Sequence, residues 1–133
     1  MARSKIKQKD YLTPLEWEVM NIIWKLGGKP TVRQVLNEGY PNREKAYTTI
    51  QTVMNNIVIK RFLKRKKTGL VNFYSPAVKR EDMIVGETNT LVNKAFGGSF
   101  LALANYLIDS DTLSQDEIAD LKRLIKQKEK DRK

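Results

Sequence analysis

The chain has 133 residues, contains neither cysteine nor histidine, and carries a formal net charge of +10. Without those two residue types, disulfides, thiolate and imidazole metal ligands, thiol nucleophiles and imidazole acid–base catalysis are all excluded. The hydrophobic content of 41% is sufficient for a folded core, and the excess of lysine and arginine favours a polyanionic partner such as duplex nucleic acid.

The N-terminal segment, residues 1–12, is polar and basic, and no apolar stretch follows it. We interpret it as a flexible basic arm and not as a secretory signal. No apolar run in the sequence approaches the roughly 18–20 residues that are needed to cross a bilayer. A cytoplasmic location is therefore expected.

Two helices are predicted in the first third of the chain from their capping signals. Thr13 with Glu16, and Thr31 with Gln34, have the spacing of a capping box, in which each side chain bonds the backbone of the other residue. Pro14 is suited to the first position of the first helix. Gly27-Gly28 ends the first apolar pattern, and Gly39, Pro41 and Asn42 end the second, so we expect one long and one short helix.

A third helix is predicted over about 43–60, with Asn42 as its N-cap. Its apolar positions recur at the spacing of a buried helix face and are Ala46, Ile50, Val53, Met54 and Ile57. The opposite side carries short uncharged groups that donate and accept hydrogen bonds, namely Thr48, Gln51, Thr52 and Asn55. Such groups suit base edges in a major groove, where each base pair presents its own donor and acceptor pattern. This segment is the predicted recognition helix.

A basic β-hairpin is predicted directly after this helix, over about 62–75. Its turn is expected to contain the cations Arg65, Lys66 and Lys67 together with Gly69, which tolerates a positive φ angle. Helices followed by a basic hairpin indicate a winged helix-turn-helix domain over 13–77. A helix pair with a purely structural role, on a basic surface that only aids solubility, is the alternative.

The remaining residues predict a helical dimerisation region over 78–128 and a charged tail over 129–133. Ser114 and Glu117 form a third capping box at the start of the last helix. Three short helices cannot cover one another's apolar faces, and oligomerisation is a common solution for such small units. Packing of these helices against the first domain is the alternative. The predicted dimer interface comprises Leu91, Phe96, Phe100, Leu103, Leu107, Ile118, Leu121, Leu124 and Ile125.

Several motifs resemble the penicillinase-repressor family of BlaI, MecI and CopY type. The segments that carry the resemblance are 15–20, 23–24, 46–52, 96–99 and 113–118, and the similarity extends from about Leu12 to Gln127. The resemblance implies a homodimeric winged-helix repressor that places its third helix in the major groove of a palindromic operator. It carries DNA contacts over to Tyr47, Thr48 and Thr52. From local chemistry we add Lys45, Gln51, Asn55 and the wing cations Arg65, Lys66 and Lys67.

Three departures from the family pattern affect what can be carried over. Copper-responsive members have paired cysteines near the C-terminus, and their absence here excludes a thiolate copper switch. Members often have Lys-Gly after the recognition helix, whereas this chain has Lys60-Arg61, and arginine takes a left-handed cap less readily than glycine. Members that regulate antibiotic resistance are cleaved after a membrane sensor is triggered, so a membrane sensor or protease is a candidate partner. Asn105-Tyr106 is similar to the cleaved Asn-Phe pair but lies one residue out of register.

The expected fold class is mainly α with a small β-hairpin wing, and the expected function is sequence-specific transcriptional repression. The expected partners are duplex operator DNA and a second copy of the chain. No catalytic residue, metal ligand or cofactor is predicted, because the sequence has no phosphate-binding glycine loop and no coherent carboxylate pair. Two other classes stay open: a protein–protein adaptor that uses the C-terminal helices, and an RNA-binding winged helix.

Overall fold

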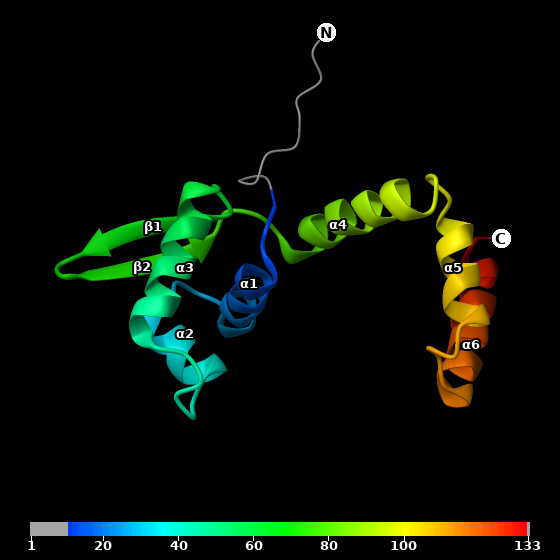
Figure 1. Cartoon of the computed structure of the whole chain (residues 1–133), viewed down its shortest axis with the longest axis horizontal. Coiled ribbons are helices and arrows are strands. Elements are labelled where there is room, and N and C mark those ends of the chain that lie inside the picture. The colour runs from blue at the N-terminus through cyan, green and yellow to red at the C-terminus, as the bar shows by residue number, and fades with distance from the viewer. Residues whose placement is uncertain (1–10, 133) are drawn as a thin grey trace, which may run out of the picture. The chain divides into compact units, whose positions relative to one another are not determined.

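The computed structural model describes residues 11–132, so the predicted basic arm lies outside the described residues except for its last two positions. Within this range the chain is mainly helical with one two-stranded antiparallel sheet (Figure 1), which confirms the predicted fold class. It divides into two compact units, the first ending at Met83 and the second beginning at Ile84. The elements are α1 (Pro14–Leu26), α2 (Val32–Gly39), α3 (Tyr47–Ile59), β1 (Leu63–Thr68), β2 (Val71–Pro76), α4 (Arg80–Ala95), α5 (Phe100–Asp109) and α6 (Gln115–Asp131).

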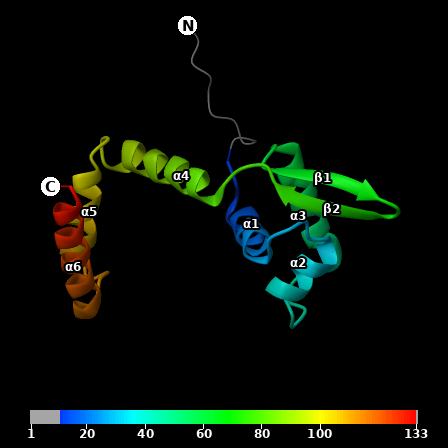
Figure 2. The same cartoon turned by 180° about the vertical axis from the view of Figure 1, so that it is seen from behind.

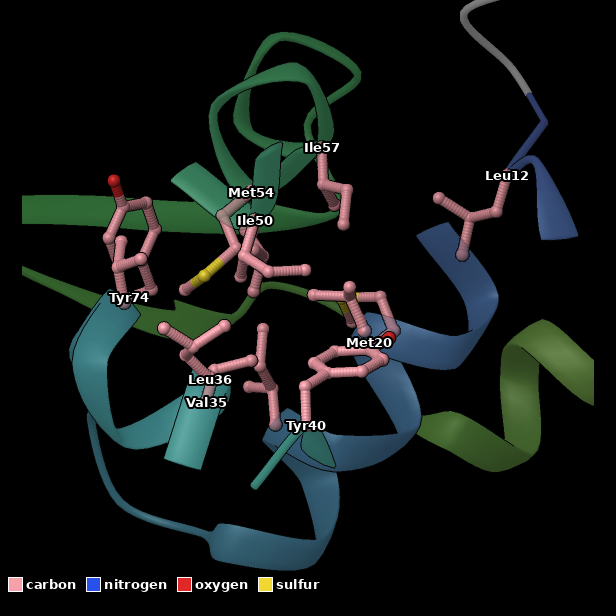
Figure 3. Close-up of a cluster of buried hydrophobic side chains, with 13 residues drawn as sticks. Leu12, Met20, Val35, Leu36, Tyr40, Ile50, Met54, Ile57 and Tyr74 are labelled. Carbon is pink, nitrogen blue, oxygen red and sulfur yellow. The ribbon is translucent and has the colours of Figure 1, made fainter. Parts of the chain in front are cut away.

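The first unit is built around one apolar core that α1, α2, α3 and the hairpin share. Figure 3 shows side chains from all four converging, including Met20 of α1, Val35 of α2, Met54 of α3 and Tyr74 of β2, and each of these four is fully buried. The hairpin lies beside α3 in both views (Figure 1, Figure 2). The order helix, helix, helix and antiparallel hairpin is that of a winged helix-turn-helix.

The predicted capping boxes at the starts of α1 and α2 are both confirmed. Thr13 Oγ1 accepts from the Glu16 backbone N–H at 3.2 Å, while the Thr13 backbone N–H donates to Glu16 Oε1 at 2.8 Å. Thr31 and Gln34 repeat the exchange at 3.2 and 2.9 Å. Each box satisfies backbone donors that the first turn of a helix leaves free, so these two helix starts depend on local sequence alone.

The predicted start of the third helix is wrong. Arg43 has φ of 64° and therefore cannot belong to a right-handed helix, and the Asn42 N–H instead donates to Glu44 Oε1 at 2.9 Å in a turn. The helix begins four residues later, at Tyr47, with Ala46 as an N-cap whose side chain makes no capping bond. Asn42 is thus not the cap, and Ala46 is exposed instead of buried. The apolar spacing extended the predicted helix by one turn, because the pattern contains no signal for a left-handed residue.

The end of α3 has the hydrogen bonds of a Schellman motif with arginine in the position that glycine usually occupies. The Phe62 N–H donates to Ile57 O at 3.1 Å and the Arg61 N–H donates to Val58 O at 2.9 Å. Arg61 has φ of 72°. The left-handed conformation that the sequence disfavours is therefore adopted, at a steric cost that glycine would not have.

The wing is a regular hairpin with a two-residue turn. Leu63 pairs with Pro76 and Thr68 pairs with Val71, so Gly69 and Leu70 alone connect the strands. Gly69 has φ of 64°, as predicted, and Leu70 does not have a positive φ, which fits a type II′ turn. The cations that were expected in the turn instead lie along β1. The turn itself presents Leu70, which is 95% exposed.

The second unit contains most of α4 and all of α5 and α6. The capping box of Ser114 and Glu117 is confirmed, with bonds of 3.1 and 2.9 Å, and the helix it begins extends to Asp131. Among the described residues of this unit, Val92 is the one hydrophobic side chain that is fully buried. Large apolar side chains lie exposed on all three helices. No helix in residues 11–132 combines the length and hydropathy that a membrane span requires.

Candidate nucleic-acid interface

The exposed face of α3 carries hydroxyl and amide groups. Thr48 and Thr52 are exposed, as expected of residues that were predicted to contact DNA, while Gln51 and Asn55 are half-buried. Asn56 is also exposed and continues the row of Thr48 and Thr52 at a spacing of four residues. Asn56 was not among the predicted site residues, although its four-residue spacing from Thr52 is visible in the sequence.

Tyr47, at the first position of α3, is 37% exposed and lies against α2. The guanidinium carbon of Arg33 lies 4.8 Å from the centre of its ring, within the range of a cation–π contact. Arg33 was not predicted as a site residue. The pairing joins two helices, so no local sequence signal pointed to it, and it adds a cation at the N-terminal end of α3.

A cleft of about 440 Å³ separates the N-terminal end of α2, the first half of α3 and the wing. Arg33, Tyr47 and Gln51 line its helical side, and Leu70 and Asn72 lie on the hairpin side. Positive charge and hydrogen-bonding groups line the concave surface between helix and wing. A nucleic-acid strand would meet both kinds of group there.

The wing cations divide between the two faces of the hairpin. Arg65 pairs in register with Tyr74, so their side chains share the face that also holds the buried Leu63, and Lys67 belongs to the same face. Lys66 points to the opposite face. All three cations are exposed, whereas Lys45, in the loop before α3, is half-buried. The predicted cations therefore lie in two places near α3: in the loop before it and on strand β1 of the wing.

Two hydrogen bonds join α3 to the wing. Asn55 Oδ1 accepts from Arg65 Nη1 at 2.9 Å and from the Tyr74 hydroxyl at 2.8 Å. Burial raises the pKa of Tyr74, and the neighbouring Arg65 partly offsets that rise. The hydroxyl therefore stays protonated and able to donate at neutral pH.

An ion pair joins the C-terminal end of α3 to α1. Lys60 Nζ lies 2.6 Å from Glu16 Oε1, and the two side chains are only 10% and 6% exposed. The same ammonium donates to the Tyr11 backbone oxygen at 2.9 Å. Both ends of α3 are thus held, one by Lys60 and the other through the packing of Tyr47 against Arg33.

The residues predicted for the dimer interface lie on the apolar surface of the second unit. Four of them are exposed in the single chain, and these are Leu91, Phe100, Leu124 and Ile125, at 43–56%. The other five are half-buried, and these are Phe96, Leu103, Leu107, Ile118 and Leu121. Phe96 and Tyr106 form a tilted ring pair with centroids 5.9 Å apart. The structure adds exposed residues that were not assigned to the interface: Ile84, Val85, Leu101, Tyr106 and Ile108.

Comparison with known proteins gives similarity over almost the whole chain. A protein-family model described as penicillinase repressor matches residues 12–127. The methicillin resistance regulatory protein MecI of Mammaliicoccus sciuri is 30% identical over 117 residues, which cover 88% of this chain and 94% of that protein. A penicillinase repressor of Staphylococcus aureus is 31% identical over 112 residues, 83% of this chain and 86% of that protein. The solution structure of the DNA binding domain of the repressor BlaI covers 58% of this chain, with 28% identity and a TM-score of 0.49.

Proposed function

The chain belongs to the penicillinase repressor family of transcriptional repressors, and from that membership we propose that it represses transcription by occupying a palindromic DNA operator as a homodimer. In this proposal α3 enters the major groove, and the β1–β2 wing lies on the sugar-phosphate backbone. The same geometry serves each half of the operator, because a twofold-symmetric dimer presents two identical helices.

The observation that carries the proposal is the composition of α3. Along its whole length, Tyr47–Ile59, this helix contains no charged residue, although 30% of the chain is charged. A helix face that only meets water usually carries charged residues, whereas hydroxyl and amide groups match the donors and acceptors of base edges. Thr48, Thr52 and Asn56 are exposed side chains that would contact base edges, and the half-buried Gln51 lies beside them.

The cations around α3 would contact phosphates. Lys45, Arg65, Lys66 and Lys67 were predicted for this role, and Arg33 joins them through its position over the Tyr47 ring. Phosphate contacts set affinity and register but carry no sequence information directly. Base recognition and phosphate binding are therefore expected to use different residues. If the dimer makes about 6–10 such contacts, its affinity falls by roughly 10³–10⁵ between 50 and 200 mM salt.

Homodimerisation through the second unit is supported by its exposed apolar surface. Side chains such as Phe100, at 55% exposed, and Leu124, at 56%, have more than half of their surface open to solvent in a single chain. Apolar surface of this extent in so small a unit is typical of an interaction site. A second copy is the partner that the twofold operator requires.

A binding titration against salt and sequence tests the proposal. Thr52→Ala should reduce the preference for operator over scrambled duplex by on the order of a hundredfold, because the homodimer loses two base contacts that are each worth about 1–3 kcal/mol. Lys66→Ala should weaken both complexes equally and reduce the salt slope by about two, because each subunit of the homodimer loses one phosphate contact. Lys128→Ala, which removes an exposed cation from α6, is the matched control for net charge. Equal behaviour of the Thr52 and Lys66 variants would contradict the division of roles.

Sedimentation of the same protein tests the dimer. Leu124→Glu places a charge on the apolar surface of α6 and should shift the protein to monomer, because desolvating a carboxylate opposes association. Gln115→Glu adds the same charge at an exposed polar position of the same helix and should leave the dimer intact. A wild-type protein that sediments as a monomer at micromolar concentration would refute the homodimer. If duplex RNA displaces bound duplex DNA, the RNA-binding alternative is favoured. If the protein binds neither duplex, the protein–protein adaptor is favoured.

A further inference from the structure

Asn55 was predicted to read bases, but its side chain faces the wing. The residue is half-buried on α3, and its Oδ1 atom accepts from both Arg65 Nη1 and the Tyr74 hydroxyl, at 2.9 and 2.8 Å. These two donors come from directly paired positions of β1 and β2. One oxygen atom therefore binds both strands of the hairpin to the recognition helix.

The hydrogen-bonding capacity of this oxygen is fully used. A carboxamide oxygen has two lone pairs, and the two donors occupy both. The orientation of the amide follows from its neighbours, because the guanidinium of Arg65 can only donate and would repel the amide nitrogen. Adenine readout by asparagine needs the oxygen to accept from the base while the nitrogen donates. Asn55 cannot make that contact without releasing Arg65 or Tyr74.

Releasing the wing would be costly, since Tyr74 is fully buried. Without Asn55 its hydroxyl would lose the acceptor to which it donates, and a buried polar group without a partner destabilises the folded state. The Arg65 side chain, by contrast, is exposed as a whole, and an arginine has five N–H donors. The contact to Asn55 uses one of these donors, and the other donors are available to a second partner such as a phosphate.

We propose that Asn55 is a positioning residue, which fixes the wing against α3 and orients Arg65 toward a phosphate of the DNA backbone. The inference rests on the proposed DNA-binding function and deepens it, because it moves Asn55 from base reading to wing placement. Asn56, which is exposed on the adjoining side of the helix, takes the reading role. Neighbouring asparagines on one helix thus act on different parts of the DNA.

Hydrogen exchange in the DNA-free protein tests the first step. Asn55→Ala should accelerate amide exchange in β1 and β2 by about tenfold, because the hairpin opens more often once its bonds to α3 are lost. Asn55→Asp keeps an accepting oxygen and should retain most of the wild-type protection. Asn37→Ala, the same substitution at an exposed position of α2, is the control. Unchanged exchange in Asn55→Ala would overturn the proposal whether or not the protein binds DNA.

Phosphate-ethylation interference on bound duplex tests the second step. Asn55→Ala should lose interference at the phosphates under the wing while its base preference stays within about twofold of the wild type. Asn56→Ala should show the opposite pattern, and Asn55→Asp should keep the wing phosphates at lower overall affinity. If Asn55→Ala loses discrimination at one base pair with the wing phosphates unchanged, Asn55 is a base reader and the inference is wrong. If wild-type protein binds no duplex, the proposed function fails, and the inference fails with it.

Discussion

Replacing Lys60 with methionine should destabilise the first unit severely. The ammonium of Lys60 and the carboxylate of Glu16 are 2.6 Å apart, with side chains 10% and 6% exposed. In the variant the Glu16 carboxylate would stay buried without its cation, and the Tyr11 oxygen would lose its donor. Breaking a buried ion pair by removing one partner costs about 3–5 kcal/mol.

This loss is large for a small domain, whose total free energy of unfolding is typically about 5–15 kcal/mol. Urea denaturation should show this loss as a fall in the midpoint of about 1–5 M, given slopes of about 1–3 kcal/mol/M. The double variant Glu16→Gln with Lys60→Met should recover most of the stability. It removes both charges, and glutamine keeps the acceptor that the capping box with Thr13 requires.

The matched control is Lys25→Met. Lys25 pairs with Glu38 at 2.9 Å, but this ion pair lies at the surface, with side chains 73% and 36% exposed. Its loss should leave the urea midpoint unchanged within error, because solvent screens exposed pairs. The reasoning is refuted if Lys60→Met lowers the free energy of unfolding by less than about 1 kcal/mol, or if the double variant is no more stable than Lys60→Met alone.

Two further predictions concern backbone strain and alkaline pH. Arg61→Gly should raise the free energy of unfolding by about 1 kcal/mol in urea denaturation, since glycine adopts the observed φ of 72° without steric cost. Arg61→Ala removes the charge but keeps the strain, so it should not raise the free energy of unfolding. If both variants raised it equally, the effect would come from the charge and not from the backbone. Burial, followed by the hydrogen bond to Glu18, raises the pKa of Tyr40, and burial raises that of Tyr74. A raised folded-state pKa means that the stability contribution is complete below about pH 10, the ordinary tyrosine value, and is lost as pH rises further. Absorbance titration of tyrosinate should therefore show these two ionising together with alkaline unfolding, and Tyr40→Phe should remove one of them; ionisation of both near pH 10 in the folded protein would contradict the assignment.

Local signals predicted much of the first unit correctly. The capping boxes of Thr13 and Thr31 lie within four residues of sequence, so nothing distant was needed to find them. The burial of Ile50, Met54 and Ile57 followed from the helical period, because residues three and four apart share a face. The positive φ of Gly69 followed from the turn chemistry of a short hairpin.

Two of the errors arose where a distant residue decides the outcome. Periodicity placed Asn55 with Thr48 and Thr52 on the polar side of α3, and only the hairpin, ten and nineteen residues further along, turns it into a wing contact. Arg33 entered the candidate site through a contact with another helix. The third helix was also predicted to start too early, with Asn42 as its cap. Apolar spacing could not reveal that Arg43 has a left-handed conformation.

The sequence by itself therefore determined the family and the winged-helix class, through short motifs along the chain, and it determined the helix starts whose capping residues lie close together. The tertiary structure alone decided which polar side chains of α3 are free and which are held. That choice depends on donors brought beside the helix by the pairing of β1 with β2. A side chain's hydrogen-bonding capacity is finite, so a group that is fully bonded within the fold has none left for a base edge.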